Sequence, residues 1–139
     1  MYTPYLKTKD GFESQMAVNY LGHFLLTHLL TPQLIAGSEN SGNNARVVNV
    51  SSCAHECGEI NFKDFHDEKY YHPGIAYGSS KLAQIMFTRH FDKICKKNKW
   101  KVQSHAVHPG IVDTELFKHT LYGSMNWFRQ LLFKVIYNA

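Results

Sequence analysis

The sequence predicts an α/β fold with a parallel sheet, and three observations carry that prediction. Two short runs rich in β-branched residues, 46–50 and 101–107, are bounded by turn signals, which is typical of buried strands. Apolar residues at helical spacing precede, separate and follow these runs, at 12–36, 75–97 and 127–136. Alternating helices and strands at this spacing indicate parallel strands joined by helical crossovers.

The first expected helix follows a turn at 8–11 and begins near Phe12. Its apolar residues recur every four positions and cover almost the whole circumference in the middle of the helix, which predicts burial against a sheet. The segment from Gly37 to Asn44 is rich in glycine, serine and asparagine. We expect it to be a loop that separates this helix from the first strand.

Composition and charge describe an ordinary globular protein of one domain. The chain has 139 residues, of which 44% are hydrophobic and 19% are charged. The net charge of +4 is mild, and the lysines clustered between Lys93 and Lys101 are expected to form a solvated helix end. We therefore expect no nucleic-acid partner. The most apolar stretch, Leu21–Leu30, is shorter than the roughly 18 residues that a membrane span needs.

Cysteines and histidines are present without a convincing metal pattern. Cys53 and Cys57 lie four residues apart, but no second cysteine pair completes a zinc site. The nine histidines include two closely spaced pairs, and neither pair has a third ligand in a recognisable pattern. We therefore expect no metal. Three cysteines without a secretory segment favour a reducing, intracellular compartment.

Tyr77 and Lys81 carry the first indication of chemistry. They are four residues apart in the second expected helix, so their side chains share one face. An ammonium about 4 Å from a phenol contributes roughly 4 kcal/mol at an effective dielectric of about 20. That energy is enough to bring a tyrosine pKa from about 10 toward neutrality, where the phenol exchanges protons with an alcohol or ketone.

The surroundings of Tyr77 make this pair more informative than its spacing. Tyr5 and Lys9 have the same spacing but no strand leads to them. Ser52, by contrast, follows the strand at 46–50, and Pro109-Gly110 follows the next strand. Open α/β sheets bind ligands at the carboxyl ends of their strands. We expect Tyr77, Ser52 and the Pro-Gly turn to meet at that edge.

These residues stand in stretches that resemble the short-chain dehydrogenase/reductase superfamily, within it the branch of retinol dehydrogenases and the X-linked dehydrogenase/reductase. The resemblance spans almost the whole chain, and the order of the motifs makes it specific. The matching stretches are KDGFE at 9–13, VNYLGHFLLT at 18–27, RVVNVSS at 46–52, AYGSSKLA at 76–83 and VHPGIV at 107–112.

The resemblance assigns roles to four residues of the catalytic set. Tyr77 would be the general acid/base, and Lys81 would lower its pKa and hold the nicotinamide ribose hydroxyls. Ser52 would hydrogen-bond the substrate oxygen. Its neighbour Ser51 is the rival candidate, because strand alternation points the two side chains in opposite directions. Asn19 matches the family's helix asparagine, which helps to hold the lysine through a water relay.

The same resemblance assigns the turn after the second strand to the cofactor. Pro109 and Gly110 would shape the loop beside the nicotinamide, and Val112 and Thr114 would contact its carboxamide. Read without the resemblance, Pro109-Gly110 is simply a turn.

One part of the family pattern is missing. Members begin with a strand and a glycine-rich turn that hold the cofactor pyrophosphate, whereas the glycines of this chain contain no G-x-G pair. We therefore interpret residues 1–139 as the catalytic, nicotinamide-side part of a single domain, truncated at both ends. The expected fold is the second half of a Rossmann-type, doubly wound parallel sheet, without the N-terminal dinucleotide-binding part.

The resemblance implies an oxidoreductase that transfers hydride between NAD(P) and a lipid-like alcohol or carbonyl compound such as a retinoid or steroid. It slightly favours NADP over NAD, although the deciding residues belong to the missing part. We expect the isolated chain to be inactive. The alternative is a non-catalytic short form that acts as an interaction or decoy module. For the longer protein to which this truncated domain would belong, we expect a cytoplasmic or endoplasmic reticulum membrane-associated location. A homo-oligomeric state is also compatible with the resemblance.

Overall fold

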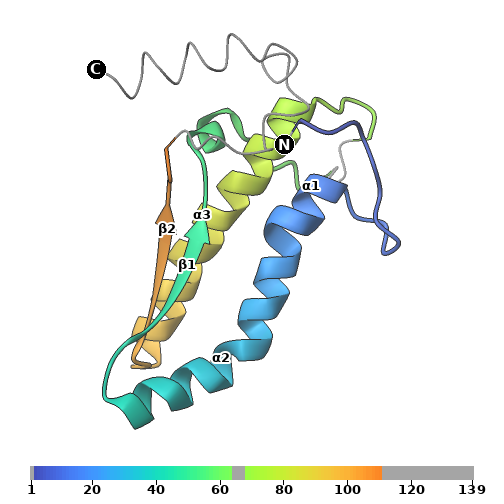
Figure 1. Ribbon diagram of the computed structural model, residues 1–139. Coiled ribbons are helices and arrows are strands. Elements are labelled where there is room, and N and C mark those ends of the chain that lie inside the picture. The colour runs from blue at the N-terminus through green and yellow to red at the C-terminus, as the bar shows by residue number, and fades with distance from the viewer. Residues whose placement is uncertain (1, 64–67, 111–139) are drawn as a thin grey trace, which may run out of the picture.

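The computed structural model describes residues 2–63 and 68–110, and its sheet has the predicted parallel topology (Figure 1). Strand β1 (Ala45–Val50) pairs with β2 (Val102–Val107) along its full length. The register places Ala45 opposite Val102 and Val50 opposite Val107. Both strands therefore end at the same edge, as expected for parallel strands joined by a helix.

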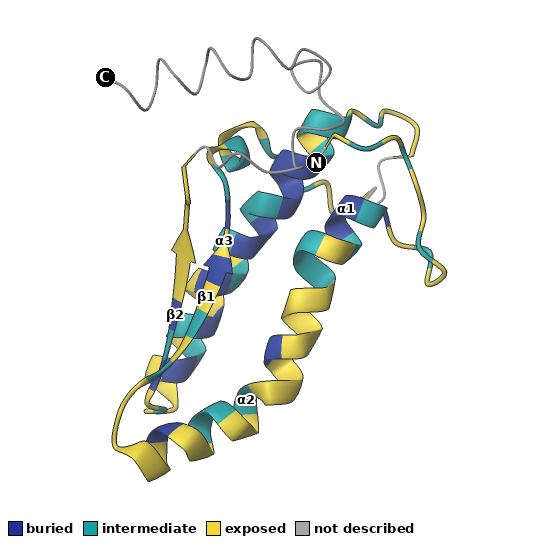
Figure 2. Cartoon of the chain, viewed as in Figure 1, coloured by how far each residue is buried: buried dark blue, intermediate teal, exposed yellow. Residues whose placement is uncertain are grey.

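Helix α3 (Pro73–Lys97) connects the two strands and carries the Tyr–Lys pair. It begins where His72 accepts a hydrogen bond from the Ile75 N–H, with Pro73 at the first helical position, where its missing N–H costs nothing. The buried face of α3 lies against the sheet (Figure 2). The predicted helix at 75–97 is thus confirmed and starts two residues earlier.

The hydrophobic core lies between α3, the sheet and the end of the first helical segment. Its central residues are buried, namely Phe91, Cys95 and Val102. Partly buried apolar side chains from all the surrounding elements pack against them: Leu34, Ile35, Ala45, Val47, Phe87 and Trp100. Because this cluster lies toward the N-terminal ends of the strands, it leaves the carboxyl edge to polar side chains.

The first helical segment consists of three pieces rather than one regular helix. They are α1 (Ser14–Met16), the π-helical turn η1 (Ala17–Leu21) and α2 (Gly22–Ser41). Glu13 caps the start, because its carboxylate accepts hydrogen bonds from the backbone N–H groups of Gln15 and Met16. Figure 1 shows α2 bending in its C-terminal half, and Pro32 lies inside this helix, where it removes one backbone hydrogen bond.

Two expectations about this segment are wrong. The predicted loop from Gly37 to Asn44 is helical as far as Ser41, and the helix ends at Gly42, whose φ of +71° is the left-handed conformation that suits glycine. The middle of α2 is also exposed rather than buried: Leu25 is 54% and Leu29 62% accessible (Figure 2). Only its later residues reach the core. The expected helix at 127–136 lies outside the described residues.

Candidate active site

The carboxyl edge of the sheet gathers the residues that the sequence singled out. Ser51 follows β1 and donates its backbone N–H to the carbonyl of Val107, the last residue of β2, over 2.8 Å. Pro109 and Gly110 come directly after β2, and Gly110 has a left-handed φ of +78°. The segments that follow β1 and β2 therefore leave the sheet at the same edge, where open α/β sheets bind their ligands. Val112 and Thr114 lie outside them.

Tyr77 lies in the first turns of α3, where its side chain is nearly buried, with 7% of its surface accessible. Burial raises the pKa of the phenol, and a side-chain hydrogen bond with Ser52 partly opposes that effect. The hydroxyl of Ser52 also accepts a hydrogen bond from the Ala54 N–H over 3.2 Å, which caps the short 3-10 helix η2 (Cys53–Cys57). Ser52 and Tyr77 thus form a polar pair at the sheet edge.

Ser51 has a different environment from Ser52. It is buried, and its hydroxyl donates to the Lys81 carbonyl over 3.0 Å, so it ties β1 to α3. Ser52 is half-buried and lies beside the Tyr77 phenol. Of the two rivals, Ser52 is therefore the one whose hydroxyl faces the phenol.

Lys81 lies one turn along α3, with its Nζ 5.6 Å from the centroid of the Tyr77 ring. Its ammonium donates to the Val50 carbonyl over 2.9 Å, and burial lowers its pKa. The sequence led us to expect that Lys81 lowers the pKa of Tyr77. In this arrangement the pKa of Tyr77 is raised, because burial of the hydroxyl is the largest effect on it. The Lys81 ammonium lies over the ring and binds the Val50 carbonyl at the end of the strand.

Asn19 belongs to η1, which packs against α3. Its side-chain amide donates to the Ser80 hydroxyl over 2.9 Å, and Ser80 in turn donates to the Tyr77 carbonyl over 2.7 Å. The Asn19 backbone carbonyl accepts from Gln84 Nε2 over 2.6 Å. Direct bonds to α3 therefore hold Asn19 beside the helix that carries Tyr77 and Lys81.

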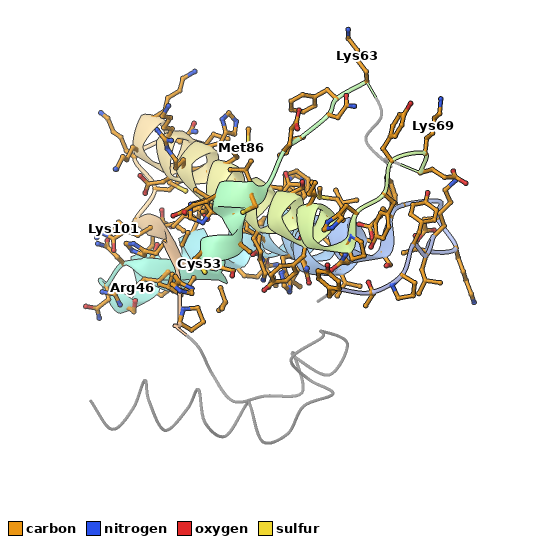
Figure 3. All side chains as sticks on the ribbon, turned by 90° about the horizontal axis from the view of Figure 1, so that it is seen from above. Arg46, Cys53, Lys63, Lys69, Met86 and Lys101 are labelled. Carbon is orange, nitrogen blue, oxygen red and sulfur yellow. The ribbon has the colours of Figure 1, made fainter. Side chains whose placement is uncertain are left out.

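The turn after Ser52 is fastened to α3 through two glycines and one serine. A Cβ atom on Gly58 would lie 2.5 Å from the Gly78 carbonyl, and a Cβ on Gly78 would lie 2.5 Å from the Ala54 carbonyl. Ser79 adds two bonds: its hydroxyl accepts from the Glu59 N–H and donates to the Glu59 carbonyl. Figure 3, a view from above, shows the turn that carries Cys53 lying across α3. We call these contacts the Gly58–Gly78 clasp.

The site contains polar residues that the sequence did not single out. Ser80 and Gln84 are almost completely buried and stand three and seven positions after Tyr77, on the α3 face toward η1. Polar residues at this spacing in a helix that packs on a sheet are the signal that could have found them. Ser79 and the glycines of the clasp had no comparable signal, because their contacts with the turn after Ser52 leave no periodic pattern in the sequence.

Comparison with known proteins agrees with the geometry. The family model described as "short chain dehydrogenase" matches residues 3–122. The chain therefore belongs to the short-chain dehydrogenase family, as its motifs indicated.

Two curated relatives illustrate the similarity. Retinol dehydrogenase 12 of Bos taurus is 49% identical over 127 residues, which are 91% of this chain and 38% of the relative. Polyprenol dehydrogenase of Homo sapiens is 42% identical over 124 residues, which are 89% of this chain and 37% of the relative. The chain thus spans less than two fifths of the length of either relative.

A solved structure supports the fold. The crystal structure of an uncharacterised protein from Mycobacterium paratuberculosis superimposes with a TM-score of 0.72 at 40% sequence identity. The match covers 96% of this chain and 45% of that protein. This agrees with the expected partial Rossmann-type α/β sheet.

Metal-binding clusters and membrane spans are absent from the described part of the chain. In the ranges 2–63 and 68–110, no group of three or more His, Cys, Asp or Glu side chains could share a metal ion. Within the same ranges, no helix is both long enough and apolar enough to cross a membrane.

Proposed function

We propose that this chain forms the proton-transfer side of an oxidoreductase that exchanges hydride between a nicotinamide dinucleotide and a lipid-like alcohol or carbonyl compound. The observation that carries the proposal is the meeting of Ser52, Tyr77 and Lys81 at the carboxyl edge of a parallel sheet. Membership of the short-chain dehydrogenase family supports the reaction class. The names of the retinol and polyprenol dehydrogenase relatives support the substrate class.

Tyr77 would supply the proton. At neutral pH its raised pKa keeps the phenol protonated, the form that donates to a carbonyl oxygen as hydride reaches the carbonyl carbon. Ser52 would hydrogen-bond the same oxygen, since its hydroxyl already lies beside the phenol. In the reverse direction the phenolate must take the alcohol proton, so the pKa of Tyr77 must fall. Lys81 is the cation within reach for that purpose.

The chain's residues fit a nicotinamide ribose better than a pyrophosphate. The bound cofactor would supply or accept the hydride. Lys81 and Tyr77 offer an ammonium and a phenol to ribose hydroxyls at the strand ends, and the turn at Pro109-Gly110, with Val112 and Thr114, would border the nicotinamide. No G-x-G turn is present in the chain to hold the pyrophosphate. The choice between NADP and NAD would depend on residues outside this chain.

A second candidate is a non-catalytic interaction module, and one observation favours it. The first half of α2 carries several large apolar side chains that are between 42% and 62% accessible, namely Phe24, Leu25, Leu26, Leu29 and Leu30. Such a patch is typical of a surface that another element or protein covers.

The experiment that separates the two candidates is a turnover assay on the full-length gene product that contains this sequence. Tyr77→Phe should abolish exchange between NADPH and a retinoid or polyprenoid carbonyl while cofactor affinity is retained. Tyr5→Phe is the matched control, because it removes the phenol of the other Tyr–Lys pair with the same spacing. Undiminished turnover in Tyr77→Phe would refute the role of Tyr77, and absent turnover in the unmodified protein would favour the interaction module.

A further inference from the structure

A buried hydrogen-bonded seam runs between η1 and α3, outside the Ser52–Tyr77–Lys81 set. Gln84 is 2% accessible and donates to the Asn19 carbonyl over 2.6 Å. Ser80 is fully buried and accepts from the Asn19 side-chain amide over 2.9 Å. The two α3 residues therefore bind both the backbone and the side chain of one residue in η1.

Asn19 lies in the π-helical turn η1. In regular α-helix each backbone carbonyl is taken up by the N–H four residues later, whereas a π-helical turn disrupts that ladder. The carbonyl of Asn19 accepts a hydrogen bond from Gln84 Nε2, and His23 Nδ1 lies 3.0 Å from the same oxygen. Such turns are rare and are found frequently at functional sites.

One residue of this seam, Ser80, also binds the backbone of Tyr77. Ser80 donates its own hydroxyl proton to the Tyr77 carbonyl over 2.7 Å, so the backbone turn that carries Tyr77 depends on the same cluster. A shift of η1 would therefore move Ser80 and the first turns of α3. Misplacing a reacting group by about 1 Å costs on the order of 100-fold in rate.

We infer that Gln84, together with Ser80, is a positioning residue that locks the π-helical turn η1 against α3 and so fixes Tyr77 for proton transfer. This inference rests on the proposed function for its kinetic consequence. That Gln84 holds η1 in place is inferred from the hydrogen bonds alone. Gln84 acts through Asn19 and Ser80 rather than by contact with the reacting atoms.

The test compares Gln84→Met with Thr88→Val in the full-length gene product. Gln84→Met keeps the side-chain length but removes the donor to Asn19. Thr88→Val is the matched control, because Thr88 is also buried on α3 and bonds Asn49 of β1 rather than η1. Ser80→Ala provides a second variant, which removes the acceptor of the Asn19 amide if Gln84→Met does not fold.

Two readouts decide the outcome. Hydrogen exchange at residues 17–23 should accelerate in Gln84→Met and Ser80→Ala but not in Thr88→Val. The kcat per folded enzyme should fall about 10- to 100-fold in Gln84→Met and Ser80→Ala. In these two variants KM should stay within about twofold, and the midpoint of the pH profile of kcat should shift. Thr88→Val should leave kcat and this midpoint unchanged. Unchanged exchange, or unchanged kcat and pH midpoint, in both seam variants would overturn the inference. If the unmodified protein has no turnover, the proposed function fails and the exchange result alone decides whether Gln84 holds η1.

Discussion

At the scale of single residues, the candidate site is defined by which hydroxyl faces which partner. Ser51 and Ser52 are adjacent in sequence, yet the first ties the strand to the Lys81 carbonyl and the second lies at the Tyr77 phenol. The sequence alone could not separate them, because strand alternation allows either register. The structure separates them by burial and by hydrogen-bond partner.

This difference predicts opposite phenotypes for two alanine variants. Ser52→Ala should lower turnover strongly, because the substrate oxygen loses its hydrogen-bond donor. Ser51→Ala should keep most turnover but lower the free energy of unfolding by about 1 kcal/mol, since it removes one buried hydrogen bond. Steady-state kinetics and urea unfolding of both variants measure the two effects. A larger loss of kcat in Ser51→Ala than in Ser52→Ala would reverse the assignment.

The half-buried phenol of Tyr20 predicts how stability depends on pH. Burial raises the pKa of Tyr20, which means that the folded state holds this proton more tightly than the unfolded state does. The stability that this phenol contributes is therefore present at neutral pH and is lost as the pH rises past the ordinary tyrosine value of about 10. Urea unfolding between pH 8 and 11 should show a shallower alkaline loss in Tyr20→Phe than in the unmodified protein. Parallel pH curves would contradict the burial of this phenol.

At the scale of elements, the site depends on how η2 is fastened to α3. The Gly58–Gly78 clasp leaves no space for a side chain, because a Cβ on either glycine would lie 2.5 Å from backbone atoms. Ser52 immediately precedes η2, and Tyr77 immediately precedes Gly78 in α3. The clasp therefore sets the separation of the two catalytic candidates.

A glycine-to-alanine pair tests the clasp. Gly78→Ala should lower the free energy of unfolding by roughly 1–3 kcal/mol and should reduce turnover, because overpacking forces η2 away from α3. Gly37→Ala is the control: this glycine lies within α2, and a methyl group there would meet no atom within 4 Å. Alanine at position 37 should therefore be neutral or stabilising by about 0.5–1 kcal/mol. Equal stability of the two variants in urea would argue against the clasp.

The elements differ in how far the sequence determines them. The helix α3 and both strands follow from local signals, namely apolar residues at helical spacing, basic residues at the helix end and β-branched runs between turns. The end of α2 does not, because Gly37 and Gly42 look alike in sequence and only the second takes a left-handed conformation. The π-helical turn η1 also escapes local reasoning, since the Gln84 that binds it comes from another element.

At the scale of the whole molecule, the described chain leaves apolar surface on both layers. The strand residues Val48 and Val50 are more than half accessible on the sheet face away from α3, and the middle of α2 is similarly exposed. The chain also spans 38% of the length of the bovine relative. A two-stranded sheet has two open edges, which is marginal for independent stability.

We therefore predict that the isolated 139-residue chain is marginally stable. It should melt without a sharp cooperative transition or aggregate, and it should bind NADPH much more weakly than an intact dehydrogenase does, because no glycine-rich turn holds the pyrophosphate. Calorimetry and fluorescence titration of the purified chain measure both properties. A cooperative two-state melt together with micromolar NADPH binding would contradict this prediction.

The central claim is that this sequence supplies the proton while the nicotinamide supplies the hydride, and one measurement addresses it directly. The full-length gene product should be incubated with a retinoid or polyprenoid carbonyl and NADPH deuterated at C4 of the nicotinamide, and the alcohol analysed by mass spectrometry. We predict deuterium on the carbinol carbon with the unmodified protein and none above background with Tyr77→Phe. Alcohol that forms without deuterium from either C4 face, or equal labelling with Tyr77→Phe, would contradict this claim.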